Sequence, residues 1–477
     1  MRYTAVALDF DGTIAHDSEV PAHVIDGLRR LKDTGRKLLL VTGRELPELL
    51  DIFKPIEIFD RVVAENGALL YRPSTGERVE LGEPPPQELI DLLRERGVPI
   101  SVGASIVATV EPHETVVLQT IRELGLERPV IFNKGAVMIL PPGINKATGL
   151  KHALAELGLS ARNLVAGGDA ENDHALLEAA EYSVAVANAI TTLKQSADRV
   201  TNLPRGDGIL EVIDDLIAND LAKTPPKRER RALRIGKDAN GSDVTVKPAG
   251  VSMLVTGAHG SGKSSFTRRV LERLSSAGYQ FCVLDGRGEY LDFRPAVVFG
   301  TQDNAPDPFE ILTALEKPDV QAVVCLAAVL PAKRAAFFEK LKLELLGLRE
   351  KTGRPHWLVI DEAQELVPRA RDAIGDAAPL AENSIYVTTD PAAIDERVIA
   401  AVDVVAVRGA AARQSLESLA AILPDDRPAE PLRAPAESEA LIWFRNTGRA
   451  PQLVTLPPRT HSDRALRNDV GRLLRRA

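Results

Sequence analysis

AVALDFDGT, residues 5–13, is an apolar, strand-like run that leads directly into two aspartates, Asp9 and Asp11. Similar runs follow it within residues 1–220: KLLLVTG, RVVAEN, NLVAGGD and YSVAVAN. Between them lie segments such as VIDGLRRLKDTG, whose apolar residues recur with the spacing of an amphipathic helix. Short strands that alternate with such helices predict a parallel sheet covered by helices on both faces. Residues 1–220 are therefore expected to form a doubly wound α/β domain.

The alternation changes between residues 82 and 142, where the order becomes helix, two strands, helix, two strands. This order predicts a small α+β module inserted into a core made of residues 1–81 and 143–220. Residues 221–235, LAKTPPKRERRALRI, combine a Pro-Pro pair with a basic run and predict a linker. Strand-like runs and helices alternate again in residues 236–477, which predicts a second parallel α/β domain.

The composition is typical of a soluble globular protein, with 44% hydrophobic and 26% charged residues. A chain of 477 residues is too long for one ordinary core and fits three domains. No apolar run approaches the roughly 20 residues that span a bilayer, and no signal-peptide pattern follows Met1. We therefore expect a cytoplasmic protein with no membrane partner. Cys282 and Cys325 lie in apolar runs without metal-ligand spacing, which favours buried core thiols.

Charge is distributed unevenly along the chain. Residues 1–220 hold 22 basic and 34 acidic side chains, whereas residues 221–477 hold 37 and 33. An acidic first half argues against binding to a nucleic-acid backbone there. The mildly basic second half leaves nucleic acid open as a partner without predicting it.

The first candidate site begins at Asp9 and Asp11. They stand two residues apart after a predicted strand, at the edge where open α/β sheets bind ligands. Alternating strand geometry favours both carboxylates on one side, where crowding raises the proton affinity of one member. One carboxylate then acts as nucleophile and the other as general acid. Taken alone, an Asp-Gly pair after a strand also fits an ordinary turn.

Three further elements accompany this pair. Thr42 in VTGR ends a strand and offers a hydroxyl and an amide to a phosphoryl oxygen. Lys146 in GINKATG stands at a predicted helix start and supplies a fixed positive charge. Asp169 and Asp173 in GGDAENDH are hard oxygen ligands suited to Mg²⁺. Each also has a structural alternative: a turn threonine, a solvated lysine, or an acidic cluster that caps a helix.

In this order, the four elements resemble the haloacid dehalogenase superfamily of phosphatases across about 215 residues. The resemblance implies that Asp9 forms a covalent phosphoaspartate and that Asp11 protonates the leaving group and then activates water. It assigns Mg²⁺ to Asp9, the Asp11 carbonyl and Asp169, with Asp173 in support. It assigns the transferring phosphoryl group to Thr42 and Lys146.

The insert, the ENG sequence that begins at Glu65, and the later VAVANA and GDGI stretches look like the Cof-like branch of that superfamily. In that branch the insert is a cap that closes over small phosphometabolites. At about 60 residues it is similar in size to the caps of archaeal-type phosphoglycolate phosphatases. A small phosphorylated metabolite is therefore the expected substrate, and its identity stays open.

The second candidate site is a nucleotide-binding loop. The strand SMLVT, the loop GAHGSGKS and a following helix match G-x-x-x-x-G-K-[ST] in its required context. The residues expected to hold ATP and its magnesium are Gly257, Gly260, Ser261, Gly262, Lys263, Ser264 and Ser265. In HWLVIDEAQ a strand delivers Asp361 to the metal, and Glu362 orients and deprotonates water. DEAQ also fits a plain acidic first helical turn.

VLDGRGEY, the helix that precedes DEAQ, and the late strand VVAVRGA together look like the HerA and FtsK group of P-loop ATPases. That resemblance implies ATP hydrolysis, with a homo-oligomer through this domain and DNA as open prospects. The chain departs from the pattern in SIYVTTD, where Thr389 remains but Asp390 replaces a polar sensor. Arg408 has two interpretations, a finger that acts on a neighbouring subunit or a structural arginine.

Three functions remain open at this point. The first is a capped small-molecule phosphatase joined to an ATP-binding and ATP-hydrolysing domain. The second is a nucleic-acid-processing motor whose phosphatase trims ends, although a cap would obstruct polymer ends. The third is a phosphatase regulated by ATP binding. The expected fold class is α/β, with two doubly wound, Rossmann-like parallel sheets, the first with a small α+β cap insertion and the second of P-loop NTPase type.

Overall fold

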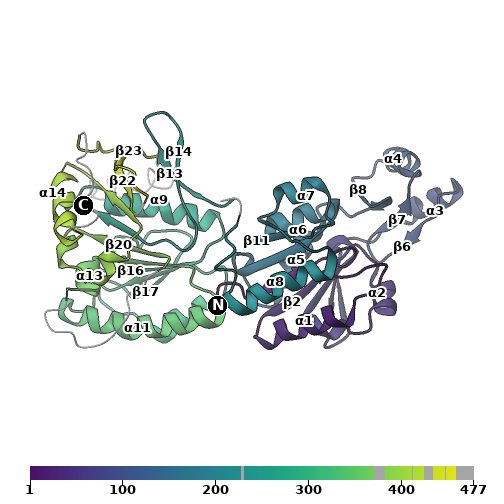
Figure 1. Ribbon diagram of the computed structural model, residues 1–477, viewed down its shortest axis with the longest axis horizontal. Coiled ribbons are helices and arrows are strands. Elements are labelled where there is room, and N and C mark those ends of the chain that lie inside the picture. Colours follow the sequence, from purple (N-terminus) through teal and green to yellow (C-terminus); the bar gives the residue numbers. More distant parts are fainter. Residues whose placement is uncertain (227–229, 370–381, 411, 424–432, 446, 458–477) are drawn as a thin grey trace, which may run out of the picture. The chain divides into compact units, whose positions relative to one another are not determined.

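The computed structural model describes residues 1–226, 230–369, 382–410, 412–423, 433–445 and 447–457. The chain divides into two compact units, Met1–Arg228 and Glu229–Ala477 (Figure 1). Both units are α/β. Among the described residues, no helix is both long and apolar enough to cross a membrane.

The first unit is built on a sheet of eight strands in the order β12-β11-β10-β1-β2-β3-β4-β5. The strands are β1 (Ala5–Leu8), β2 (Lys37–Val41), β3 (Arg61–Ala64), β4 (Leu69–Arg72), β5 (Glu77–Glu80), β10 (Leu164–Gly168), β11 (Tyr182–Ala185) and β12 (Arg199–Val200). From β12 to β3 the strands are parallel, as the sequence predicts. The hairpin β4–β5 extends the sheet antiparallel at one edge. The apolar runs at β1, β2 and β10 are buried in one continuous core.

The connecting helices of this unit are α1 (Ala22–Asp33), α2 (Leu46–Ile52), α5 (Lys146–Glu156), α6 (His174–Ala179), α7 (Thr191–Ser196) and α8 (Arg205–Asn219). Short 3₁₀ turns are η1 (Ile56–Ile58), η2 (Glu65–Gly67), η3 (Ala161–Asn163) and η4 (Glu171–Asp173). Helices α1 and α8 pack on each other, as do α5 and α6. The turn η2 packs against α5, and this contact positions the start of that helix.

Between β5 and α5 the chain forms a separate small sheet in the order β6-β7-β9-β8. Its elements are α3 (Gln87–Glu95), β6 (Ser101–Val102), β7 (Val107–Val110), α4 (Glu114–Glu123), β8 (Val130–Asn133) and β9 (Ala136–Ile139). Both helices pack on one face of this sheet, around Leu89, Val107 and Val117. The chain enters and leaves the small domain at neighbouring points: a Cβ added to Gly82 would lie 2.4 Å from the Pro141 ring. We call this segment the cap.

The second unit has an eleven-stranded sheet in the order β14-β13-β23-β22-β21-β15-β20-β19-β16-β18-β17. The strands are β13 (Leu233–Lys237), β14 (Asp243–Val246), β15 (Met253–Thr256), β16 (Phe281–Asp285), β17 (Val297–Phe299), β18 (Ala322–Cys325), β19 (Trp357–Asp361), β20 (Ser384–Thr388), β21 (Val404–Val407), β22 (Glu439–Phe444) and β23 (Gln452–Thr455). From β21 to β17 the strands are parallel, and β22, β23, β13 and β14 add an antiparallel edge.

The helices of the second unit are α9 (Lys263–Ser276), α10 (Pro308–Leu315), α11 (Pro331–Thr352), α12 (Ala363–Leu366), α13 (Glu396–Ala400) and α14 (Ala412–Ile422), with one 3₁₀ turn, η5 (Pro391–Ala393). Cys282 and Cys325 are buried free thiols in this sheet, as predicted. One boundary differs from expectation. Strand β13 begins at Leu233, inside the stretch expected to be a linker, because Leu233 and Ile235 are buried in the core of this unit.

Candidate active site

Three neighbouring strands of the first sheet end level with one another. Leu8 of β1 pairs with Gly167 of β10 on one side and with Leu40 of β2 on the other. Asp9 therefore follows β1, Asp169 follows β10, and Thr42 follows β2 at the same edge. The polar residues that the sequence places at strand ends are brought to one edge by this register.

Three carboxylates gather there. Asp9, Asp169 and Asp173 are buried, and each offers an oxygen that lies within 4.8 Å of the others. The Lys146 ammonium, at the start of α5, lies 2.6 Å from Asp9 Oδ1 and 2.7 Å from Asp173 Oδ1. The Asn145 side chain fixes this helix start because it accepts hydrogen bonds from the first-turn amides. One buried cation thus bridges two of the three carboxylates.

The acidic group fits a divalent metal. Asp173 is held in place, since its Oδ2 accepts the amides of Asp169 and Ala170 at 2.9 and 3.0 Å. Asp169 Oδ1 is buried and meets no hydrogen-bond partner among the described residues. An unpaired buried carboxylate oxygen next to two more carboxylates is the donor set that Mg²⁺ prefers.

Burial and neighbouring charges shift the pKa values of the cluster's side chains. Desolvation, followed by the neighbouring Asp173 carboxylate, raises the pKa of Asp9 to about 7, against the opposing charge of Lys146. Burial also raises the pKa of Asp169, and the nearby Lys134 opposes that shift. Burial alone would lower the pKa of Lys146, but the charges of Asp173 and Asp9 outweigh it and raise this pKa. Perturbed groups of this kind concentrate at functional sites.

The carboxylate of Asp11 points elsewhere. Arg44 donates Nε to Asp11 Oδ2 and Nη2 to Oδ1, each at 2.7 Å. The acidic group that could hold a metal does not include the Asp11 side chain, and the expectation that Asp9 and Asp11 face one side stays a prediction. Arg44 was missed although it stands in VTGR, two residues after Thr42. An arginine two residues after Thr42, a predicted ligand of the phosphoryl group, was the available signal.

Thr42 and Thr13 line the same strand ends. The hydroxyl of the buried Thr42 accepts the Arg44 amide at 3.1 Å, and the Thr42 amide donates to Val63. The Thr13 hydroxyl, which the sequence analysis did not single out, donates to Asp9 Oδ2 at 3.3 Å. Asp9 is therefore held through Oδ1 more closely than through Oδ2.

The nucleotide-binding loop of the second unit adopts the expected strand-loop-helix arrangement. It follows β15, and Lys263 opens α9, with Gly262 in the left-handed region at φ 88°. Lys263 Nζ donates to the carbonyls of Gly257 and Ala258 at 3.1 Å. The Ser264 hydroxyl contacts the carboxylate of Glu289, from the DGRGEY stretch. Gly260, Ser261 and Ser265 lie in the same loop and first helical turn.

Asp361 and Glu362 lie where the sequence predicts, at the end of β19. Asp361 is buried, its pKa is raised by burial, and its Oδ2 lacks a hydrogen-bond partner within the described ranges. Glu362 pairs with Arg287 at 2.9 Å. Burial lowers the pKa of Lys263, and the charges of Glu362 and Asp361 act in the opposite direction. The two acids are thus near enough to influence the lysine electrostatically.

Arg408 and Asp390 have structural contacts. Arg408 is 2% exposed, and a Cβ added to Gly262 would lie 2.8 Å from its Nη2. Arg408 therefore packs beneath the loop of its own chain, which favours the structural interpretation. Asp390 caps the turn η5 by accepting the Ala392 amide at 3.0 Å, which accounts for an aspartate at this position.

Comparison with known proteins identifies both units. The profile for haloacid dehalogenase-like hydrolases matches residues 6–112 and 104–213, and the profile for an AAA domain matches residues 249–384. The phosphoglycolate phosphatase of Methanothermobacter thermautotrophicus is 30% identical over 218 residues, which cover 44% of this chain and 96% of that protein. The one from Haloarcula marismortui is 32% identical over 216 residues, covering 43% and 94%.

The chain belongs to the haloacid dehalogenase-like hydrolase family. A solved haloacid dehalogenase-like hydrolase from Bacteroides thetaiotaomicron covers 45% of this chain and 99% of its own, at 20% identity and a TM-score of 0.40. The first unit is thus a haloacid dehalogenase-type phosphatase domain, similar to phosphoglycolate phosphatases and carrying a buried aspartate cluster, and the second holds an AAA-type P-loop domain.

In the haloacid dehalogenase-like half, the cap contacts the core at Glu65 and at Lys134. The Glu65 carboxylate accepts the cap amides of Ala104 and Ser105 at 3.1 and 2.9 Å, and burial raises its pKa. Lys134, at the tip of the β8–β9 hairpin, donates to Asp169 Oδ2 and to the Asp11 carbonyl. Neither contact could be predicted from the sequence, because each depends on how the cap folds onto the core.

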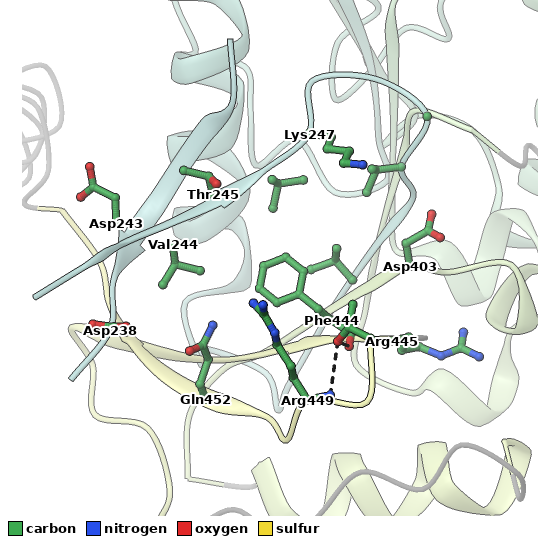
Figure 2. A pocket seen from close by; sticks show the side chains of 15 residues that line it. Asp238, Asp243, Val244, Thr245, Lys247, Asp403, Phe444, Arg445, Arg449 and Gln452 are labelled. Carbon is green, nitrogen blue, oxygen red and sulfur yellow. Dashed lines mark hydrogen bonds between the residues drawn. The ribbon is translucent and has the colours of Figure 1, made fainter. Parts of the chain in front are cut away.

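A cavity of about 540 Å³ lies in the AAA half, between the β13–β14 hairpin and the β22–β23 hairpin (Figure 2). Phe444, Arg449 and Gln452 line it together with Asp403. It is beside the amino-terminal ends of β15 and β21, whereas the nucleotide-binding loop follows the carboxyl end of β15. This cavity is therefore separate from the residues that the sequence predicts to bind ATP.

Proposed function

We propose that the haloacid dehalogenase-like half is a magnesium-dependent phosphomonoester hydrolase that forms a phosphoaspartate at Asp9. The observation that carries this proposal is the buried group of Asp9, Asp169 and Asp173, in which Lys146 bridges Asp9 and Asp173. Lys146 holds Asp9 Oδ1 at 2.6 Å, whereas Oδ2 has the longer contact with Thr13. The second oxygen is therefore the better placed to attack phosphorus.

The remaining residues receive roles from their chemistry. Asp11 gives a proton to the leaving oxygen and later takes one from the attacking water. Thr42 and Lys146 hold the phosphoryl oxygens through a hydroxyl and a fixed positive charge. Asp9, the Asp11 carbonyl and Asp169, with Asp173 in support, would hold magnesium, which would supply positive charge to the phosphoryl oxygens.

The proposed substrate is a small phosphorylated metabolite similar to phosphoglycolate. Relatives named as phosphoglycolate phosphatases match this half over nearly their full length. The cap supports a small substrate, because Glu65 binds two cap amides and Lys134 reaches the cluster, which leaves the cap closely applied to the strand ends. Such closure excludes water and selects compact substrates.

For the AAA half we propose ATP binding and hydrolysis of the type found in the HerA and FtsK group. Lys263 and Ser264 would contact the phosphates and their magnesium, while Asp361 and Glu362 would serve the metal and the attacking water. Asp361 supports this proposal, since it is buried with an unpaired oxygen within the described ranges, near Lys263.

The experiment that tests both proposals measures phosphate release from phosphoglycolate, other small phosphate esters and ATP. The parent is compared with Asp9→Asn and Lys263→Ala. Asp9→Asn should abolish release from the esters and leave ATP hydrolysis intact, and Lys263→Ala should do the reverse. Ester hydrolysis that survives Asp9→Asn rules out the first site, and ATP hydrolysis that survives Lys263→Ala rules out the second.

A further inference from the structure

The tip of the cap hairpin is an unusual place for a lysine. Asn133 pairs with Ala136, so Lys134 and Gly135 form a two-residue turn with φ values of 50° and 84°. Turns of this kind require positive φ at both positions and favour Asn-Gly, whereas a long side chain is disfavoured at the first position. A residue kept in a strained conformation directs attention to what its side chain does.

The Lys134 ammonium lies on the acidic cluster. It is 2.7 Å from Asp169 Oδ2 and 2.9 Å from the Asp11 carbonyl. Gly12 makes room for it, because an added Cβ there would lie 2.5 Å from Nζ and 2.3 Å from Asp169 Oδ2. The Lys134 side chain is also 45% exposed, so it reaches the buried cluster from a position that is open to solvent along part of its length.

The two acceptors of Lys134 are groups that the proposed function assigns to magnesium. A metal ion on the Asp11 carbonyl and Asp169 would repel an ammonium on the same atoms. Lys146 makes two hydrogen bonds to carboxylates, and Arg44 makes two to Asp11 and one to Glu48. Of these three cations, half-exposed Lys134 is the one best able to move to a new partner, and it belongs to the cap.

The phosphoryl group is expected next to Asp9 and Lys146, at the strand ends, so the leaving group of the substrate extends toward the cap. We propose that Lys134 is a specificity-determining residue that binds a second anionic group, of the carboxylate class, on this leaving group. When metal and substrate bind, the Lys134 ammonium leaves Asp169 and the Asp11 carbonyl and binds that anion instead. This inference rests on the proposed function and names the substrate class of the same site.

The test compares phosphoglycolate with ethyl phosphate, which is similar in size but lacks the carboxylate. Lys134→Met should lower kcat/KM for phosphoglycolate by about tenfold or more, mainly through KM, and leave ethyl phosphate within about twofold. Lys134→Arg should restore part of the loss. Arg122→Met, which removes an exposed cation from helix α4 of the cap, should behave as the parent does.

A second readout is metal affinity without substrate, measured by titration with Mg²⁺ in a calorimeter. Lys134→Met should bind the ion more tightly than the parent, because no ammonium has to be displaced. Equal losses on both esters, or unchanged metal affinity, overturn the proposal. If the parent hydrolyses neither ester, the proposed function is wrong. The role of Lys134 is then tested by binding of phosphoglycolate to Asp9→Asn and to Asp9→Asn/Lys134→Met. Equal affinity in these two variants overturns that role.

Discussion

Arg44 holds Asp11 through two parallel hydrogen bonds, Nε to Oδ2 and Nη2 to Oδ1, each of 2.7 Å. Hydrogen bonding to Asp11 is the main cause of the raised pKa of Arg44. Paired bonds of this type fix both the position and the plane of a carboxylate. The proposed acid of the reaction is therefore oriented by a residue two positions beyond Thr42.

Replacing Arg44 with methionine should lower kcat for ester hydrolysis by about tenfold to a hundredfold, because an unoriented acid delivers its proton poorly. KM should change less. Steady-state kinetics on phosphoglycolate provide the measurement. Glu48→Gln is the control, since Glu48 contacts Arg44 but not Asp11. A kcat for Arg44→Met equal to that of the control would contradict the positioning role.

Gly67→Ala should disturb the active site through the backbone. Gly67 has φ 105°, and an added Cβ would lie 2.0 Å from the carbonyl oxygen of Asn145, which precedes Lys146. The start of α5 must shift, and a displacement of about 1 Å at a catalytic group can cost about a hundredfold in rate. The measurement is kcat beside the melting temperature. Gly76→Ala is the matched control: its φ is 73°, but no described atom lies within 4 Å of the added Cβ. Similar kcat values in both variants would show that strain alone is responsible.

Gly262→Ala should weaken ATP binding by about tenfold or more and leave ester hydrolysis unchanged. Gly262 has φ 88°, and an added Cβ would lie 2.8 Å from Arg408 Nη2. Both effects distort the loop whose amides are expected to face the phosphates. Calorimetric titration with ATP measures the change. Gly241→Ala, with φ 79° and open space around the added Cβ among the described atoms, serves for comparison. Equal ATP affinity in the two variants would refute the prediction.

Glu156 makes stability depend on pH. It joins Arg61 of β3 to Arg72 of β4, and hydrogen bonding to Arg72 is the main reason that its pKa is lowered to about 2. A carboxylate whose pKa is lowered in the folded state stabilises the fold at pH values above its unfolded-state pKa of about 4.3. This stabilisation is lost as the pH falls toward the folded-state pKa of about 2. Glu156→Gln should therefore cost roughly 1 kcal/mol at pH 7, a figure reduced for partial exposure, and almost nothing near pH 2.

Melting temperatures of the haloacid dehalogenase-like half across pH 2 to 7 measure this difference. Glu95→Gln removes an exposed carboxylate from α3 and should give a melting temperature that parallels the parent at every pH. A Glu156→Gln deficit that stays constant down to the acid limit would show that the ion pairs contribute nothing.

The sequence predicted the residues that follow parallel strands, because strand ends meet at one edge whatever the details of packing. Asp9, Thr42 and Asp169 were found in this way. The direction of the Asp11 carboxylate could not be predicted, since it depends on Arg44, which follows the neighbouring strand and binds this carboxylate. The position of Lys134 at the site could not be predicted either, because it depends on the tertiary contact that the tip of the β8–β9 hairpin makes with the core. The antiparallel strand β4 was missed because LLYR is as apolar as a parallel strand, and its direction is set by its pairing with β3 and β5.

Because Gly82 and Pro141 are neighbours, the cap is an insertion whose two ends lie side by side. A foreign segment spliced between them would leave the path of the host chain unchanged on either side. Recombination at this pair would therefore replace the cap and leave Asp9, Asp169 and Asp173 of the core unchanged. A chimera that carries a relative's segment should keep ester hydrolysis and acquire the donor's choice of ester.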